Sequence, residues 1–248
     1  MLIDTHFHLD LMENMQTLIQ ELAASKDIGI FAVGTTPMAY KREKAFCKGS
    51  RNICVGLGLH PQLISERANE IRLFINHIVE SNVIGEIGLD FSPAYKSSYE
   101  QQLACFREIC KVCAHEGRKC LSIHSVKSAG IAISILEDSC TFKTCRCILH
   151  WFTGSKSELR KAVENGAYFS INPRMINTKG GQEIIKSVPL DRLLLETDAP
   201  FACRVLNVEQ LKKELTGLLH SISTIRGFDI GDQLEENSIS ILTMCQNV

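Results

Sequence analysis

The sequence predicts an α/β fold, namely one (β/α)₈ barrel (a TIM barrel) that spans residues 1–248. Three observations predict it. The chain has 248 residues, which is a typical length for this barrel. Short apolar runs alternate with longer amphipathic segments. Residue types that bind metals stand at the ends of most of the apolar runs, and this third observation separates a closed barrel from an open sheet.

The apolar runs are short and often β-branched, as buried strands are. Eight of them recur along the chain: Leu2–Asp4, Ile30–Gly34, Ile53–Leu57, Val83–Glu86, Cys120–His124, Arg146–His150, Tyr168–Ile171 and Leu193–Thr197. Their ends lie 21 to 38 residues apart, which is the spacing expected of repeated strand–helix units.

The segments between the runs have helical periodicity. Clear cases are Met15–Ala24, Ser98–Glu116 and Val208–Ile225. In the first of these, four apolar side chains fall on one helical face: Met15, Leu18, Ile19 and Leu22. Eight strands that alternate with helices fit either a closed barrel or an open doubly wound sheet, and periodicity alone does not separate the two.

The composition and net charge limit the classes of function that the chain can have. Hydrophobic residues make up 45% and charged residues 22% of the chain, and the formal net charge is −1. Binding to a phosphate backbone would therefore require a local cationic patch. No apolar run approaches the length of a membrane span, and Asp4 and Asp10 interrupt the place where a signal peptide would be apolar. We expect a cytoplasmic protein.

The eleven cysteines are odd in number, which favours reduced thiols over a disulfide framework. Cys110 and Cys113 form a CxxC pair within a helical pattern, and no second CxxC follows at zinc-finger spacing. We interpret them as buried core thiols.

Candidate ligands follow one positional rule, because each lies at or just beyond the C-terminal end of a predicted strand. They are His6, His8, His60, Glu86, His124, His150 and Asp198. In a closed parallel barrel these ends meet on one face, whereas an open sheet would spread them too widely for one site. Imidazole and carboxylate are ligands for Zn²⁺, Mn²⁺ and Mg²⁺. The remaining histidines fall on predicted helices: His77, His115 and His220.

The stretches DTHFHLD, GLHP, GEIGLDF, LHWFTG and ETDAP occur in this order. Over about residues 1–200 the chain resembles the TatD-like deoxyribonucleases in these motifs. The resemblance implies a barrel that holds two divalent cations, with one set of ligands around the first: His6, His8 and Asp198. Glu86 would bridge the cations, His124 and His150 would hold the second, and His60 would face the substrate phosphate. The implied activity is phosphodiester hydrolysis, commonly 3′–5′ exonuclease action on DNA.

Two features depart from the family pattern. Val126 stands where the family usually has an arginine, with Lys127 beside it. Only Phe201–Asn207 replace a longer family loop after ETDAP. We therefore expect an open groove with Phe201 and Val205 at its lip. A protein partner could dock at this shortened loop, as in TatD-like subunits of bacterial anti-phage systems.

The ligands indicate a mechanism. Two cations (Mg²⁺, Mn²⁺ or Zn²⁺) bridged by Glu86 would activate a water, and Asp198 would take its proton. Basic residues in the loops of the same rim could neutralise a phosphodiester: Lys127, Lys156, Arg174, Lys179 and Arg204. Together with His60, we select Lys127, Arg174 and Arg204 as substrate-binding candidates. Tyr95 and Phe201 could stack on bases of single-stranded DNA ends.

Three alternatives remain open. An amidohydrolase of this fold often carries a carboxylated lysine at the fourth strand, where this chain has Glu86. A phosphoesterase acting on a small molecule shares the two-metal chemistry. A non-catalytic subunit would not need a full ligand set. No dinucleotide or P-loop motif is present, which argues against a nucleotide-cofactor enzyme.

Overall fold

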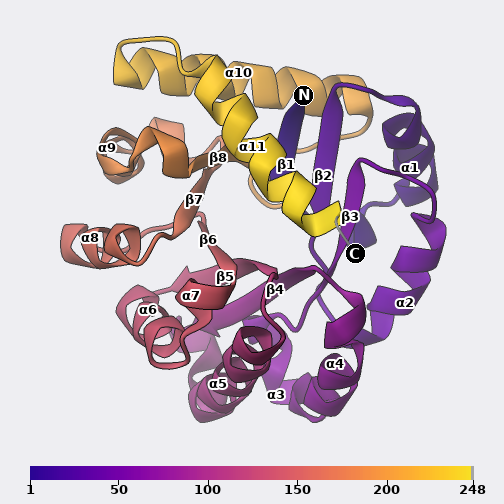
Figure 1. Cartoon of the computed structure of the whole chain (residues 1–248), viewed down its shortest axis with the longest axis vertical. Coiled ribbons are helices and arrows are strands. Elements are labelled where there is room, and N and C mark those ends of the chain that lie inside the picture. The colour runs from indigo at the N-terminus through magenta and orange to yellow at the C-terminus, as the bar shows by residue number, and fades with distance from the viewer. Residues whose placement is uncertain (247–248) are drawn as a thin grey trace.

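The computed structural model describes residues 1–246 and shows a closed parallel barrel in which neighbours along the chain are neighbours in the sheet, and β8 pairs with β1. This confirms the predicted (β/α)₈ fold (Figure 1). The strands are β1 (Leu2–Phe7), β2 (Ile28–Ala32), β3 (Ile53–Leu57), β4 (Val83–Asp90), β5 (Cys120–Val126), β6 (Arg146–His150), β7 (Tyr168–Ile171) and β8 (Leu193–Leu195).

Helices surround the barrel (Figure 1). They are α1 (Met15–Ala24), α2 (Pro37–Phe46), α3 (Ile64–Arg67), α4 (Ile71–His77), α5 (Tyr99–Glu116), α6 (Ala129–Asp138), α7 (Thr141–Thr144), α8 (Lys156–Glu164), α9 (Lys179–Ser187), α10 (Val208–Arg226) and α11 (Gly231–Gln246). The main core lies between their apolar faces and the barrel wall.

Several strand limits differ from the predicted ones. Strands β1, β4 and β5 run two to four residues further than the apolar runs indicate, and β8 ends two residues earlier. The extra residues include buried polar side chains (Thr5, His6, Asp90 and Ser125), and these interrupt the apolar pattern. As a result His6 lies within a strand rather than after it, and Glu86 and His124 lie within strands rather than at their last residues.

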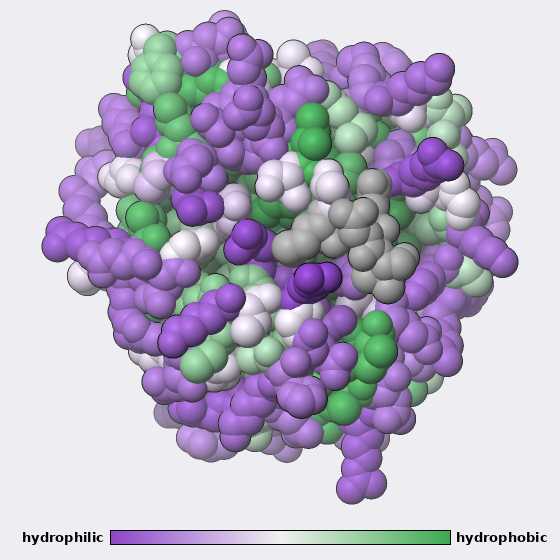
Figure 2. Space-filling view, viewed as in Figure 1, coloured by the Kyte–Doolittle hydropathy of each residue, from purple (hydrophilic) through white to green (hydrophobic). Residues whose placement is uncertain are grey.

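The C-terminal helix closes one end of the barrel. Helix α11 packs against β1, β3, β5 and β8 and crosses the barrel near the N-terminal ends of the strands (Figure 1). A second core lies beneath it and joins Ile241 and Leu242 to side chains of the strands: Ile3, Phe31, Val83, Cys120, Ile148, Tyr168 and Leu194. Figure 2 shows that the outer surface of this face is mostly hydrophilic, with hydrophobic residues in small separate groups.

Capping residues stabilise the N-termini of helices α8 and α10. Ser155 and Glu158 form a capping box at α8, in which the Ser155 side chain accepts from the Glu158 N–H. Asn207 caps α10 by accepting from the Gln210 N–H. All eleven cysteines carry unpaired thiols, and Cys110 and Cys113 are buried on α5. Within residues 1–246, no helix combines the length and the apolar character needed to cross a membrane.

Candidate metal centre

The candidate ligands gather at the C-terminal ends of the strands, at the opposite end of the barrel from α11. They border a cavity of about 390 Å³. It is lined by His8, His60, Gln62, Glu86, His124, Ser125, Val126, His150, Trp151, Thr153, Asp198 and Phe201. His6 is fully buried beside His8. One concave site therefore unites residues that are distant in sequence.

The first strand places two imidazoles side by side. His6 and His8 are alternate residues, so they point to the same side, while Phe7 between them is buried in the main core. Their Nε2 atoms are 3.2 Å apart, and Asp198 Oδ1 lies 3.7 Å from the first and 3.5 Å from the second. The Asp198 N–H donates to the His6 carbonyl over 3.0 Å, which fixes this grouping.

Glu86 lies at the centre of the site and is 1% exposed. Its Oε1 lies 2.6 Å from His124 Nδ1 and 2.9 Å from His150 Nε2. Its Oε2 lies 3.1 to 3.3 Å from the Nε2 atoms of three other imidazoles: His6, His8 and His60. The two oxygens of one carboxylate therefore face two different sets of nitrogen donors.

Three groups of donor atoms lie close enough together to hold a cation, with all atoms of a group within 4.8 Å of one another. They are His6–His8–Asp198, His6–Glu86–His150 and His60–Glu86–His124. The first is the set that the family resemblance implies around one cation, whereas the second combines His6 of that set with Glu86 and His150. The third also includes His60, which the sequence places at the substrate phosphate.

Buried partners fix the orientation of the imidazoles. The second nitrogens of three histidines face polar side chains: Ser122 Oγ at 2.7 Å from His6 Nδ1, Asp90 Oδ2 at 3.1 Å from His124 Nε2, and Glu196 Oε1 at 3.6 Å from His150 Nδ1. Such partners set which nitrogen is free to bind a metal. Among the described residues, His8 Nδ1 and His150 Nδ1 are buried without a hydrogen-bond partner, because the 3.6 Å contact of His150 with Glu196 is too long for a hydrogen bond.

The ionisation of the site is set by these contacts. Burial alone would raise the pKa of Glu86, but the imidazoles of His60, His150 and His6 hold it well below its ordinary value. Burial alone would lower the pKa of His8, but Asp198 and Glu86 raise it to about 10.

The pKa values of two further imidazoles are set by the same two opposing effects. Burial opposes the charged form of His150 and of His124, yet the facing carboxylates raise the pKa of each. Without a cation, therefore, imidazole protons balance the buried carboxylates. A divalent cation can take the place of these protons, and this mixture of imidazole and carboxylate donors fits Zn²⁺, Mn²⁺ or Mg²⁺.

The cationic candidates lie further out. Lys127, Arg174 and Arg204 are exposed, and none of them lines the metal cavity. The Arg174 guanidinium donates through Nη2 to the Phe201 carbonyl over 2.6 Å. Phe201 is 51% exposed and stands edge-on to His8. The expectation that Val205 forms part of the lip is wrong, because its side chain is fully buried in the main core, where apolar contacts outweigh exposure.

Sequence reasoning assigned no role to four residues that shape the site: Ser122, Asp90, Glu196 and Trp151. Glu196 accepts from the Trp151 N–H and from Asn172 Nδ2, each over 3.0 Å. Asp90, Trp151 and Glu196 all lie within the quoted motifs, so a signal was present. Their roles depend on contacts between strands that one sequence does not display.

The chain is similar to several known proteins. The family described as "TatD related DNase" matches residues 3–238. A protein of Buchnera aphidicola described as an uncharacterized metal-dependent hydrolase is 34% identical over 81% of this chain and 78% of its own length. A protein of Erwinia tasmaniensis named 3′-5′ ssDNA/RNA exonuclease TatD is 28% identical, with 86% of both chains covered.

The fold has solved counterparts. A TatD homologue from Escherichia coli superposes with a TM-score of 0.81 at 21% identity and covers 100% of this chain and 98% of its own.

Proposed function

Because the chain belongs to the TatD-related DNase family of metal-dependent hydrolases, we propose that it cleaves phosphodiester bonds of DNA with two divalent cations, as a 3′–5′ exonuclease on single-stranded ends. One observation carries the two-metal part: the two oxygens of Glu86 face separate sets of imidazoles. The preference for single strands draws on the name of the Erwinia relative.

In this proposal the ligands divide as the family resemblance implies. His6, His8 and Asp198 would hold one cation, His124 and His150 the other, and Glu86 both. When bound, such cations supply a deprotonated water at neutral pH and polarise a phosphoryl oxygen. Asp198 takes the proton of the attacking water, because its carboxylate both borders the cavity and lies beside the His6–His8 pair.

His60 has a different part. The backbone N–H of Gln62 donates to His60 Nδ1 over 3.2 Å, so the proton of the neutral ring is on Nε2. A nitrogen that keeps its proton does not bind metal, but it donates a hydrogen bond. We therefore assign His60 Nε2–H to the substrate phosphate or the departing oxygen, although its position beside Glu86 and His124 would also suit a ligand.

The rim supplies the remaining contacts. Phe201 is exposed beside the cavity and offers a face to a base. Lys127, Arg174 and Arg204 would attract the backbone from outside the cavity. The segment 201–207 also leaves Leu206 exposed at 44%, and we place a possible protein partner on this side.

The deciding experiment compares substrates with and without metal. A 5′-labelled single-stranded oligonucleotide should shorten stepwise from its 3′ end in the presence of Mg²⁺, Mn²⁺ or Zn²⁺, and a duplex should be cut more slowly. The same preparation is assayed on a chromogenic phosphodiester, with proteins encoded beside the gene added in a separate series. A clear preference for the small ester would replace the nuclease with a small-molecule phosphoesterase.

A further inference from the structure

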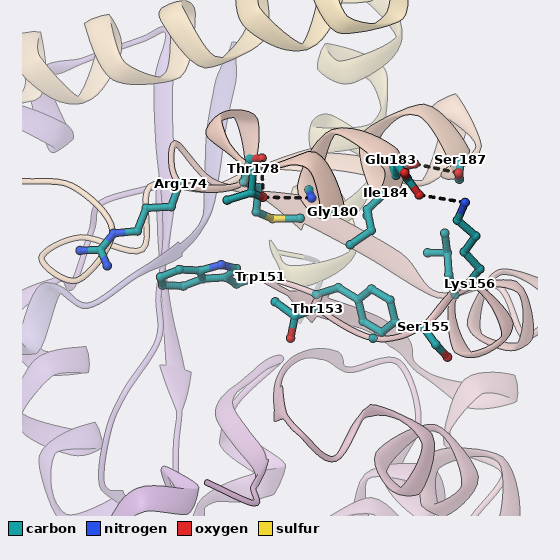
Figure 3. A pocket seen from close by; sticks show the side chains of 15 residues that line it. Trp151, Thr153, Ser155, Lys156, Arg174, Thr178, Gly180, Glu183, Ile184 and Ser187 are labelled. Atoms are coloured by element: carbon teal, nitrogen blue, oxygen red, sulfur yellow. Dashed lines mark hydrogen bonds and ion pairs between the residues drawn. The ribbon is translucent and has the colours of Figure 1, made fainter.

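A second cavity adjoins the metal cavity. It measures about 550 Å³ and lies between the segment that follows β6 and the start of α9 (Figure 3). Trp151 and Thr153 line both cavities, so the two share a wall. This volume lies within the range of pockets that bind small molecules and cofactors. We call this second cavity the side groove.

Trp151 stands at the junction and is held from several sides. Its backbone N–H donates to buried Glu196 over 3.0 Å, and its φ is +40°, a conformation that a bulky residue rarely adopts. The guanidinium of Arg174 lies 5.6 Å from the centre of the indole ring. Strained backbone that the surroundings fix in place is typical of functional sites. The ring is half-buried, so part of it stays accessible.

The side groove is largely apolar, and an exposed ion pair stands at its far end. Phe152, Leu159 and Ile184 line it. Figure 3 shows Trp151 and Arg174 at one end and the ion pair of Lys156 with Glu183 at the other, where Lys156 Nζ lies 2.8 Å from Glu183 Oε2. Because this groove adjoins the metal cavity, it can accept the last nucleotide of a chain whose next phosphodiester lies in that cavity.

We propose that the side groove binds the terminal nucleotide of an unpaired strand, with its base stacked on Trp151 and the adjoining phosphodiester over the metal centre. The proposal rests on the nuclease function proposed above and adds a subsite to it. Stacking on an aromatic ring tolerates all four bases, since each has a π-face. The subsite therefore selects a free end and not a sequence.

The test uses the fact that Trp151 is the only tryptophan of the chain, so its fluorescence reports on this subsite. Chelated, metal-free protein is titrated with three single-stranded hexanucleotides: an intact one, one with an abasic residue at the 3′ end, and one with an abasic residue in the interior. The intact strand should quench the fluorescence and bind about tenfold more tightly than the 3′-abasic strand. Equal affinity for the intact and the 3′-abasic strand would overturn the proposal.

Glycines supply a matched pair of variants. Gly180 lines the side groove and Gly217 lies on α10, and at both a Cβ atom would meet nothing within 4 Å. Gly180→Phe should fill the groove and weaken binding of the intact strand about tenfold, whereas Gly217→Phe should bind as the unmodified protein does. Trp151→Phe should retain more of the affinity than Trp151→Ala; because both variants lack the only tryptophan, their binding is measured by the fluorescence anisotropy of a 5′-labelled strand. An unchanged affinity in Gly180→Phe contradicts the proposal.

The two proposals fail in different ways. Binding is measured without metal and without cleavage, so quenching that depends on the terminal base would stand even if the metal-loaded protein cut no DNA. Cleavage of DNA with no such quenching would keep the nuclease and remove the subsite.

Discussion

At the scale of single residues, the chemistry depends on how one carboxylate is surrounded. Glu86 has five imidazole nitrogens within 3.3 Å. Burial of an unbalanced charge is costly, and the imidazoles offset that cost when cations are absent. The same positions suit two cations when they are present, because each oxygen of Glu86 then has its own set of neighbours.

We expect Glu86→Gln to lower metal affinity about 100-fold or more and to abolish turnover, because it removes the charge that both cations would share. The amide keeps the shape of the side chain, so the barrel should remain folded. Metal content of the purified protein and single-turnover kinetics check this.

The matched control is His220→Gln. His220 is exposed on α10, away from the metal cavity, so metal content and rate should both match the unmodified protein. Normal turnover by the Glu86→Gln variant would show that Glu86 does not bridge the two proposed cations.

A second buried carboxyl affects stability. Glu43 is 3% exposed, and neither of its carboxylate oxygens has a hydrogen-bond partner among the described residues. Burial, together with the nearby Asp10, raises its pKa to about 8, against a smaller opposing effect of His8. The folded protein therefore binds this proton up to a higher pH than the unfolded chain does.

For such a group, stability is fully present below the unfolded pKa near 4.5 and is lost as pH rises towards the folded value of about 8. We expect Glu43→Gln to be more stable than the unmodified protein at pH 8, by a few kcal/mol, and to gain much less at pH 5. Urea denaturation at the two pH values measures this. Glu13→Gln, at an exposed position, should leave the pH dependence as it is, and an equal gain at both pH values would contradict the argument.

At the scale of elements, what the sequence predicts depends on which side chains a strand carries. The limits of β3, β6 and β7 match the apolar runs. In β4 the run was taken to end at Glu86, although the strand continues to Asp90. Polar residues in a strand interrupt its apolar pattern, so the hydropathy of the sequence indicates a loop where the strand in fact continues.

The residues of the site also differ in how far the sequence predicts them. The candidate ligands are predictable because imidazoles and carboxylates follow strand ends in a repeated position. The side groove is not predictable, since Trp151 and Gly180 become neighbours only when the segments after β6 and β7 pack together. Glu196, just after β8, likewise meets Ser170 of β7 and the Trp151 N–H just after β6 only when the barrel has closed.

Helix α11 provides a prediction at this scale. Ile241 is 1% exposed and belongs to the core beneath α11, whereas Ile239 on the same helix is 41% exposed. We expect Ile241→Ala to lower the free energy of unfolding by about 2–4 kcal/mol, because it removes buried methyl groups and leaves a cavity. Denaturation in urea checks it.

Ile239→Ala serves as the matched control and should change the free energy of unfolding by less than about 0.5 kcal/mol. Neither substitution should alter hydrolysis by the folded protein, because α11 lies at the opposite end of the barrel from the ligands. Similar losses of stability in the two variants would mean that α11 does not seal the core as described.

At the scale of the whole molecule, the two ends of the barrel have different tasks. One end is sealed by α11 over an apolar core, and the other leaves buried imidazoles and carboxylates around an open cavity. With a formal net charge of −1, the molecule as a whole does not attract DNA. We therefore expect the substrate to be bound by the end of the barrel that carries the candidate ligands and by its loops.

The metal end also links the whole barrel, since its candidate ligands come from β1, β4, β5 and β6 and from the segment after β8. The unfolded chain lacks this arrangement, so a cation that binds there stabilises the fold by mass action, by about 2.7 kcal/mol at a hundredfold excess over Kd. We expect exhaustive chelation to abolish hydrolysis and to lower Tm together, and Mg²⁺, Mn²⁺ or Zn²⁺ to restore both. Glu86→Gln should show little metal-dependent shift in Tm. Full activity in protein shown to be metal-free would remove the mechanism proposed for this site.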